Sequence, residues 1–227
     1  MLIEVPAVLT SLQLASFLSA LRDAAWVDGR LTAGPQSAEG KDNLQADAAD
    51  ATVRRLSDEV LRALEVNALF LSAALPRHVF PPIFSRYEPG MKFGAHVDNA
   101  VRQIPGTPHR LRTDLSATLF LSDPADYDGG ELMIEDSFGT HSVKLAAGNM
   151  VLYPSSSLHL VQPITRGCRL AAVFWMQSMV RDAGQRSLLF DLDQSIQHLR
   201  PAGSLEEPGW IRLTSCYHNL LRRWADL

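Results

Sequence analysis

The first third of the chain places apolar residues at helical spacing in two stretches. Thr10 can cap a first helix, whose apolar positions are Leu12, Leu14, Phe17, Leu18 and Leu21. A second helix is expected over about residues 47–67, with an apolar face formed by Val53, Leu56, Val60, Leu61 and Leu64. Between the two, residues 26–30 are typical of a short strand or turn and residues 34–43 of a loop. We therefore predict an N-terminal helical support region over residues 1–76.

After Pro76 the pattern changes to short apolar runs separated by Gly, Pro, Asp and Asn. Examples of these runs are residues 83–87, 117–121, 131–134, 150–153 and 170–175. Short strands at close and even spacing are typical of a β-sandwich or a β-barrel. Residues 77–179 are therefore predicted to form a β core.

Helical spacing returns in the last part of the chain, residues 180–227. One helix is indicated by Leu188, Leu189, Leu192, Ile196 and Leu199, and a last one over about residues 210–225 by Leu213, Tyr217, Leu220, Leu221 and Trp224. A break between them is expected at residues 201–203. Such helices would brace the core, form a dimer interface or shape a substrate mouth. The predicted fold class is α+β, with N-terminal helices, a β core and a C-terminal helical hairpin.

Composition and charge exclude several classes of protein. Apolar residues make up 46% and charged residues 20% of the 227 positions, which is an ordinary globular balance. The net charge of -4 argues against a general nucleic-acid binder. No apolar run is long enough for a membrane span, and the N-terminus lacks the pattern of a signal peptide. With two cysteines and no CxxC pair, we expect a cytoplasmic protein in a reducing compartment.

The residues His96 and Asp98, which follow a glycine, are the first candidates for a metal site. On a strand, residues two apart point to the same face, so the imidazole and the carboxylate can converge on one ion. His159, which begins another apolar run, is the best third ligand. Two histidines and one carboxylate leave one face of an octahedral ion open, as non-haem Fe(II) oxygenases require. Alone, the pair is also compatible with an ordinary turn; the third ligand favours the metal site.

Arg169 follows His159 by ten residues and suggests a second function for the same site. If the chain forms a hairpin around residues 165–167, both side chains would share one face of neighbouring strands, offset by roughly 13 Å of strand. This spacing would suit a small dicarboxylate that chelates the metal at one end and meets the guanidinium at the other. A 2-oxoglutarate enzyme needs such an arrangement.

The segment of residues 101–112 follows the metal candidates directly. It carries four basic or titratable side chains: Arg102, His109, Arg110 and Arg112. One interpretation is that it lines the mouth of the site and meets an acidic or polar substrate; the other is a solvated loop. The five other histidines have no comparable partners and are expected to be structural or exposed: His78, His109, His141, His198 and His218.

Taken together, the spacing of these residues resembles the Fe(II)/2-oxoglutarate-dependent dioxygenase superfamily. Four further stretches make the chain similar to its bacterial prolyl/lysyl-hydroxylase (PKHD-type) subgroup, which is associated with iron uptake. They are RYEPGM at residues 86–91, RTDLSATLFLSD at 112–123, YDGGEL at 127–132 and YHNLLRRW at 217–224. Each stretch alone is a weak signal, but their order and spacing cover nearly the whole chain.

The resemblance implies a double-stranded β-helix core, of the jelly-roll or cupin-like kind. It implies that His96, Asp98 and His159 are the catalytic Fe(II) ligands and that Arg169 and Tyr87 bind 2-oxoglutarate, with L-ascorbate as a further cofactor. The carboxylate of Asp98 favours hydroxylation over halogenation. The chain departs from the pattern at Phe120, which stands where related prolyl hydroxylases place a tyrosine, so the group that assists Arg169 is left open.

Two other functions are compatible with the sequence. One is a cupin-like metalloenzyme that does not use 2-oxoglutarate, and the other is a non-catalytic sensor of iron or 2-oxoglutarate. For the hydroxylase, the expected partners are O2 and an unidentified small-molecule or peptidyl substrate, with no nucleic acid and no membrane. The association with iron uptake suggests a siderophore-related substrate, and a homo-oligomer is left open.

Overall fold

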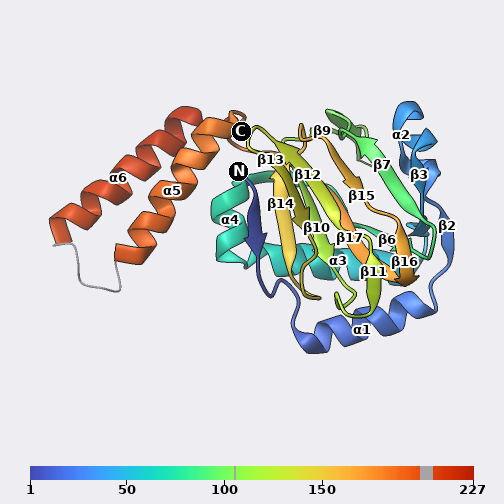
Figure 1. Cartoon of the computed structure of the whole chain (residues 1–227). Helices are drawn as coiled ribbons and strands as arrows, with labels where there is room; N and C mark the ends of the chain where they lie inside the picture. Colours follow the sequence, from blue (N-terminus) through green and yellow to red (C-terminus); the bar gives the residue numbers. More distant parts are fainter. Residues whose placement is uncertain (105, 200–206) are drawn as a thin grey trace.

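A computed structural model describes residues 1–104, 106–199 and 207–227 (Figure 1). Two antiparallel sheets form its centre. The larger sheet has the order β1 (Ile3–Val5), β14 (Met150–Pro154), β10 (Leu115–Phe120), β17 (Arg169–Ser178), β6 (Ile83–Tyr87), β4 (Leu44–Ala46) and β2 (Trp26–Asp28), and β5 (Pro76–Val79) also pairs with β17. The smaller sheet has the order β13 (Gly139–Val143), β12 (Leu132–Asp136), β15 (His159–Val161), β7 (Lys92–His96) and β3 (Lys41–Asp42).

Two short strand pairs lie beside these sheets. One joins β11 (Tyr127–Gly129) to β16 (Ile164–Gly167), and the other joins β8 (Val101–Gln103) to β9 (Arg110–Arg112). Between the two sheets lies a buried cluster that includes Tyr87, Phe120, Tyr153 and Val161. The α+β class and the double-stranded β-helix core are thus confirmed.

The N-terminal helices α1 (Ser11–Arg22), α3 (Ala51–Glu65) and α4 (Ala68–Ala74) pack against the larger sheet (Figure 1). Their buried residues form one core with that sheet, in which Phe17 meets Phe84 edge to face at 6.1 Å between ring centroids. The prediction that Thr10 caps the first helix is confirmed, because its hydroxyl accepts a hydrogen bond from the Gln13 backbone N–H at 3.3 Å.

The segment of residues 34–43 differs from the expected loop. It contains the helix α2 (Pro35–Glu39), after a 3₁₀ turn at Gly29–Thr32, and the strand β3. The strand β3 pairs with β7 of the smaller sheet, and β4, which follows this segment, pairs with β6 of the larger sheet. Gly94 on β7 donates its N–H to Gly40 at 2.8 Å, and a Cβ added to Gly94 would lie 3.5 Å from Gly40 Cα. The two glycines permit this close approach. A strand of only two residues, such as β3, is too short to show an alternation of apolar residues, so the sequence pattern did not predict it.

The predicted hairpin between His159 and Arg169 is wrong. The strand β15 pairs with β12 and β7, whereas β17 pairs with β10, β6 and β5, so the two residues belong to different sheets. The chain between them instead forms β16, which pairs with β11. Gly167 has a φ of 77°, and a Cβ there would lie 2.0 Å from the Asp126 carbonyl oxygen, so this crossing requires a glycine.

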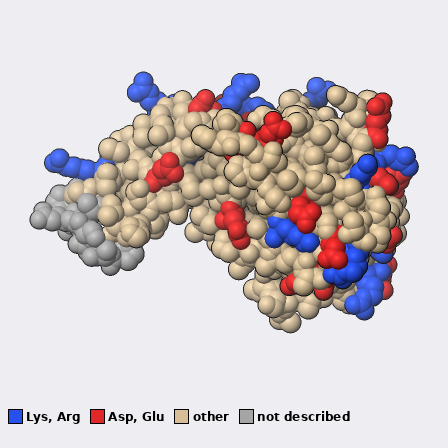
Figure 2. All heavy atoms as spheres, viewed as in Figure 1, with Lys and Arg blue, Asp and Glu red and all other residues tan. Residues whose placement is uncertain are grey.

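The C-terminal helices α5 (Ala183–Leu199) and α6 (Glu207–Trp224) form the expected pair and project from the β core (Figure 1). Leu189 of α5 forms a buried cluster with Leu75 and Val180, against which Tyr217 and Leu221 of α6 pack. Ser72 donates a hydrogen bond of 2.6 Å to Asp193 of α5. The helix break expected at residues 201–203 lies outside the described residues. No helix of the described part is long and apolar enough to cross a membrane. On the face drawn in Figure 2, basic and acidic side chains are interspersed over the β core.

Candidate active site

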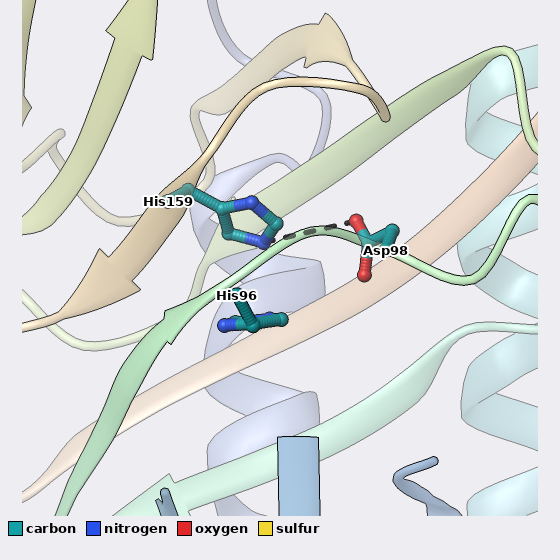
Figure 3. Close-up of side chains that lie close together, drawn as sticks. All are labelled: His96, Asp98 and His159. Carbon is teal, nitrogen blue, oxygen red and sulfur yellow. Dashed lines mark ion pairs between the residues drawn. The ribbon is translucent and has the colours of Figure 1, made fainter. Parts of the chain in front are cut away.

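His96, Asp98 and His159 converge at one end of the smaller sheet (Figure 3). His96 ends β7 and His159 begins β15, and the two residues are direct partners in the ladder between these strands. Asp98 lies two residues beyond the end of β7 rather than on the strand. One ligand atom from each residue lies within 4.8 Å of the other two, and the two imidazole centroids are 4.2 Å apart. A single ion can therefore contact all three.

The two imidazoles are held by backbone carbonyls. His96 Nδ1 lies 2.8 Å from the Gly94 carbonyl oxygen and His159 Nδ1 lies 3.0 Å from that of Ser157. A carbonyl only accepts, so each Nδ1 carries the proton and donates it, which leaves each Nε2 with a free lone pair. His159 Nε2 lies 3.7 Å from Asp98 Oδ2, on the side where the three residues meet. This arrangement is the usual way in which proteins orient metal-binding histidines.

Asp98 is held by a serine, itself in contact with a second serine, and the sequence singled out neither. Ser116 on β10 donates a hydrogen bond of 2.6 Å to Asp98 Oδ2, and its hydroxyl lies 2.7 Å from that of Ser155. The link joins the carboxylate to the larger sheet, although Asp98 follows a strand of the smaller one. The sequence pattern could not predict this contact, because Ser116 lies inside an apolar strand and its partner Asp98 is 18 positions away in the chain.

The electrostatics of the site keep His96 ready to bind a metal. Burial, together with the neighbouring His159, lowers the pKa of His96 from 6.5 to about 4. The imidazole is therefore neutral at physiological pH, as a metal ligand must be. Two imidazole nitrogens and one carboxylate oxygen suit Fe(II) with open coordination positions.

Arg169 lies in the same pocket and is only 1% exposed. Its guanidinium carbon is 5.3 Å from the centroid of the Tyr87 ring, on the neighbouring strand, and 5.2 Å from that of Phe120. Among the described residues, its Nε and one terminal nitrogen have no hydrogen-bond acceptor. Buried cationic donors without acceptors are costly, so these nitrogens fit a carboxylate that enters the pocket.

A second tyrosine beside Arg169 is Tyr127, which begins β11. Burial raises the pKa of the Tyr127 hydroxyl, and the positive charge of Arg169 opposes this effect. Gly130 allows the two side chains to lie close together, because a Cβ there would be 3.0 Å from Arg169 Cδ and 3.1 Å from Tyr127 Cε2. Phe120 carries no hydroxyl, whereas Tyr87 and Tyr127 each place a phenol near Arg169.

One pocket contains all of these predicted residues. It encloses about 740 Å³ of empty space, including its open mouth, and its walls include the three candidate metal ligands, Arg169 and Tyr87. Segments 32–45 and 97–102 complete the wall and bring Lys41 and Arg102 into it. The other five histidines lie outside this wall, as expected.

Comparison with known proteins gives the same picture along the whole chain. Residues 82–177 match the model of the 2OG-Fe(II) oxygenase superfamily, and residues 183–226 match that of the PKHD-type hydroxylase C-terminal domain. Among solved structures, a Pseudomonas putida prolyl-4-hydroxylase superposes with a TM-score of 0.53 at 21% identity, covering 78% of this chain and 92% of its own. HygX from Streptomyces hygroscopicus, with nickel and 2-oxoglutarate bound, gives a TM-score of 0.51 at 18% identity and covers 76% and 81% of the chains. These likenesses show the fold.

Sequence relatives match this chain along its whole length. The chain is 56% identical to a PKHD-type hydroxylase of Methylobacterium nodulans over 227 residues and 57% identical to one of Methylobacillus flagellatus over 226 residues, with 100% of each chain covered. At this identity and coverage the relatives share the whole architecture, including the C-terminal helix pair. The chain belongs to the PKHD-type hydroxylases of the 2OG-Fe(II) oxygenase superfamily, and it is an Fe(II)- and 2-oxoglutarate-dependent hydroxylase.

Proposed function

We propose that His96, Asp98 and His159 bind the Fe(II) and that Arg169 binds the distal carboxylate of 2-oxoglutarate, for the hydroxylation of a substrate C–H bond. The observation that carries this proposal is their position in one pocket. Three ligand atoms lie within 4.8 Å of one another there, beside a guanidinium with unpaired buried nitrogens. Imidazole and carboxylate ligands suit iron. The planar guanidinium of Arg169 suits a carboxylate, which it can bind through two hydrogen bonds.

Bound Fe(II) would supply the chemistry that activates O2 while 2-oxoglutarate is decarboxylated to succinate. The protein residues orient the reactants. Gly94 and Ser157 fix the histidine tautomers, and Ser116 holds the carboxylate of Asp98. Tyr87 and Phe120 wall the guanidinium of Arg169 and keep water from it.

Tyr127 is the residue that we assign to assist Arg169. Its hydroxyl is buried without an acceptor or donor of good geometry among the described residues, beside the Arg169 guanidinium. An entering carboxylate would accept from both groups. The phenol that related prolyl hydroxylases carry at the position of Phe120 is thereby replaced from another strand.

Several finer features complete the proposal. L-ascorbate keeps the iron ferrous, and the enzyme is cytoplasmic. Its substrate is a small molecule or a peptidyl group, with a role in iron uptake. Residues 1–76 support the catalytic core of residues 77–179, while residues 180–227 brace it or form a homo-oligomer interface.

The test of the proposed ligands needs no substrate. Anaerobic protein is mixed with Fe(II) and then with 2-oxoglutarate, and the weak visible metal-to-ligand charge-transfer band is recorded. We expect the band in the wild type, its loss in Asp98→Ala, and a much higher 2-oxoglutarate requirement in Arg169→Ala. Arg110→Ala, which removes an exposed arginine of β9, is the matched control and keeps the wild-type titration. No band in the wild type, with tight binding of another divalent metal, would favour a cupin-like enzyme that does not use 2-oxoglutarate.

A further inference from the structure

Two further cations line the pocket, and the proposed function uses neither. Lys41 on β3 is 8% exposed, and its neighbour across the ladder is Phe93 on β7. Its ammonium donates a hydrogen bond of 3.2 Å to the Thr32 hydroxyl and lies 5.1 Å from the Phe93 ring centroid. Phe93 in turn stacks on the imidazole of His96, with 3.6 Å between centroids. Lys41 is therefore one aromatic ring away from a proposed iron ligand.

Arg102 reaches the pocket from β8. Its guanidinium carbon lies 3.7 Å from the centroid of a Trp175 ring and 5.0 Å from that of Phe80. Its Nε is buried and has no hydrogen-bond partner among the described residues. The aromatic contacts fix the plane of the guanidinium and leave its hydrogen-bonding edge unused.

Neither cation has an ion-pair partner within 4.0 Å among the described residues. The carboxylate of Asp98 acts on both through space, and it is the only carboxylate among the described residues of the pocket wall. Burial, followed by the nearby charge of Arg102, lowers the pKa of Lys41 from 10.5 to about 8. The fold thus holds a buried ammonium and a half-buried guanidinium without an ion-pair partner at contact distance, which is typical of groups retained for binding.

The charges of the proposed holoenzyme balance without Lys41 and Arg102. The two positive charges of Fe(II) and the one of Arg169 are matched by Asp98 and the two carboxylates of 2-oxoglutarate. The cosubstrate cannot also neutralise Arg102, which stacks on Trp175. Trp175 lies six positions along β17 from Arg169, roughly 20 Å along an extended strand. Two positive charges are left over beside the iron site.

We propose that the substrate carries an anionic group, a carboxylate in the simplest case, and that Lys41 and Arg102 bind it. This inference rests on the proposed function, because the charge balance assumes bound iron and 2-oxoglutarate. A carboxylate would accept from the unused edge of the Arg102 guanidinium and from the Lys41 ammonium. The group is held beside Asp98 and His96, so the C–H bond that is hydroxylated lies close to the acidic group of the substrate.

The experiment uses benzoate and benzamide, which match in shape and differ in charge. The anaerobic protein is saturated with Fe(II) and 2-oxoglutarate, the visible band is recorded, and binding of each labelled probe is measured by equilibrium dialysis. Wild type is compared with Lys41→Met and Arg102→Met. The matched controls are Lys92→Met on β7 and Arg110→Met on β9, each of which removes an exposed cation of a neighbouring strand.

We expect the wild type and both controls to bind benzoate about tenfold more tightly than benzamide, and each pocket variant to lose most of that preference. The retained visible band in the pocket variants would show that the fold and the iron site are intact. Equal binding of the two probes by a wild type that shows the band would overturn this inference and leave the proposed function standing. Absence of the band from the wild type would overturn both. A preference that persists in both pocket variants would place the anion elsewhere.

Discussion

The pocket wall holds Arg169 at one end and Arg102 at the other, and the two ends are built in different ways. Arg169 begins β17 and lies between the two sheets, walled by Tyr87 and Phe120. Arg102, at the other end, comes from the short pair of β8 and β9 and stacks on Trp175. The first end belongs to the rigid core, whereas the second is assembled from segments laid against it. In the proposed function, the cosubstrate end is thus built by core strands, and the substrate end by the segments of residues 32–45 and 97–102 that lie against them.

The largest expected effect separates the two ends directly. Arg169→Gln removes the charge that meets the distal carboxylate, and we expect the 2-oxoglutarate concentration for half-maximal visible band to rise by about 100-fold or more. Arg102→Gln, at the other end, should leave that titration within about twofold, because no part of the cosubstrate reaches Trp175. If the 2-oxoglutarate concentration for half-maximal band rose equally in both variants, the two arginines would bind the same ligand. The proposed separation into a cosubstrate end and a substrate end would then be wrong.

The difference between the two ends also explains what could be predicted from the sequence. His96, His159 and Arg169 lie at strand ends of the core and Asp98 lies two residues beyond one, and the spacing of the four along the chain indicated a metal and a dicarboxylate site. The predicted hairpin was nevertheless wrong, because a strand that crosses between sheets has the same apolar pattern as one that turns back. The side chains met as expected through another topology.

Lys41 was not predictable in this way. It lies on a strand of two residues, inside a segment expected to be a loop, and it reaches the site through the pairing of that strand with β7. Arg102 was one of four candidates in residues 101–112, and the pattern could not separate them. In the structure His109 and Arg110 are exposed and Arg112 pairs with Asp114 at 2.7 Å, which leaves Arg102 alone in the pocket wall. The positions of Lys41 and Arg102 in the pocket wall depend on contacts between segments far apart in the chain, and not on local composition.

A smaller effect tests the interior of the cosubstrate end. Tyr127→Phe removes one hydroxyl next to Arg169 without changing the volume of the ring. We expect the apparent affinity for 2-oxoglutarate to fall about tenfold, the size of one hydrogen bond to a charged group, with iron affinity unchanged. The visible titration measures the first quantity and equilibrium dialysis of the metal the second. Tyr153→Phe, which removes the hydroxyl of a buried tyrosine beside His159, is the comparison variant, and an equal loss there would argue against a specific role for Tyr127.

The smallest expected effect is on stability, at the substrate end. Lys41→Met replaces a buried cation, so the iron-free variant should be more stable than the wild type at pH 7, by about 1–2 kcal/mol or a few degrees in Tm. The folded-state pKa of Lys41 is about 8 and its ordinary value 10.5, so between these values the unfolded chain binds a proton that the folded protein has lost. The wild type therefore regains stability as the pH rises through 8, and the advantage of the variant shrinks toward pH 10. Urea unfolding of both proteins at pH 7, 8.5 and 9.5 measures this gap. A variant that is less stable at pH 7, or a gap independent of pH, would show that the charge of Lys41 is stabilised within the apo protein, and that no anionic substrate group is needed to compensate it.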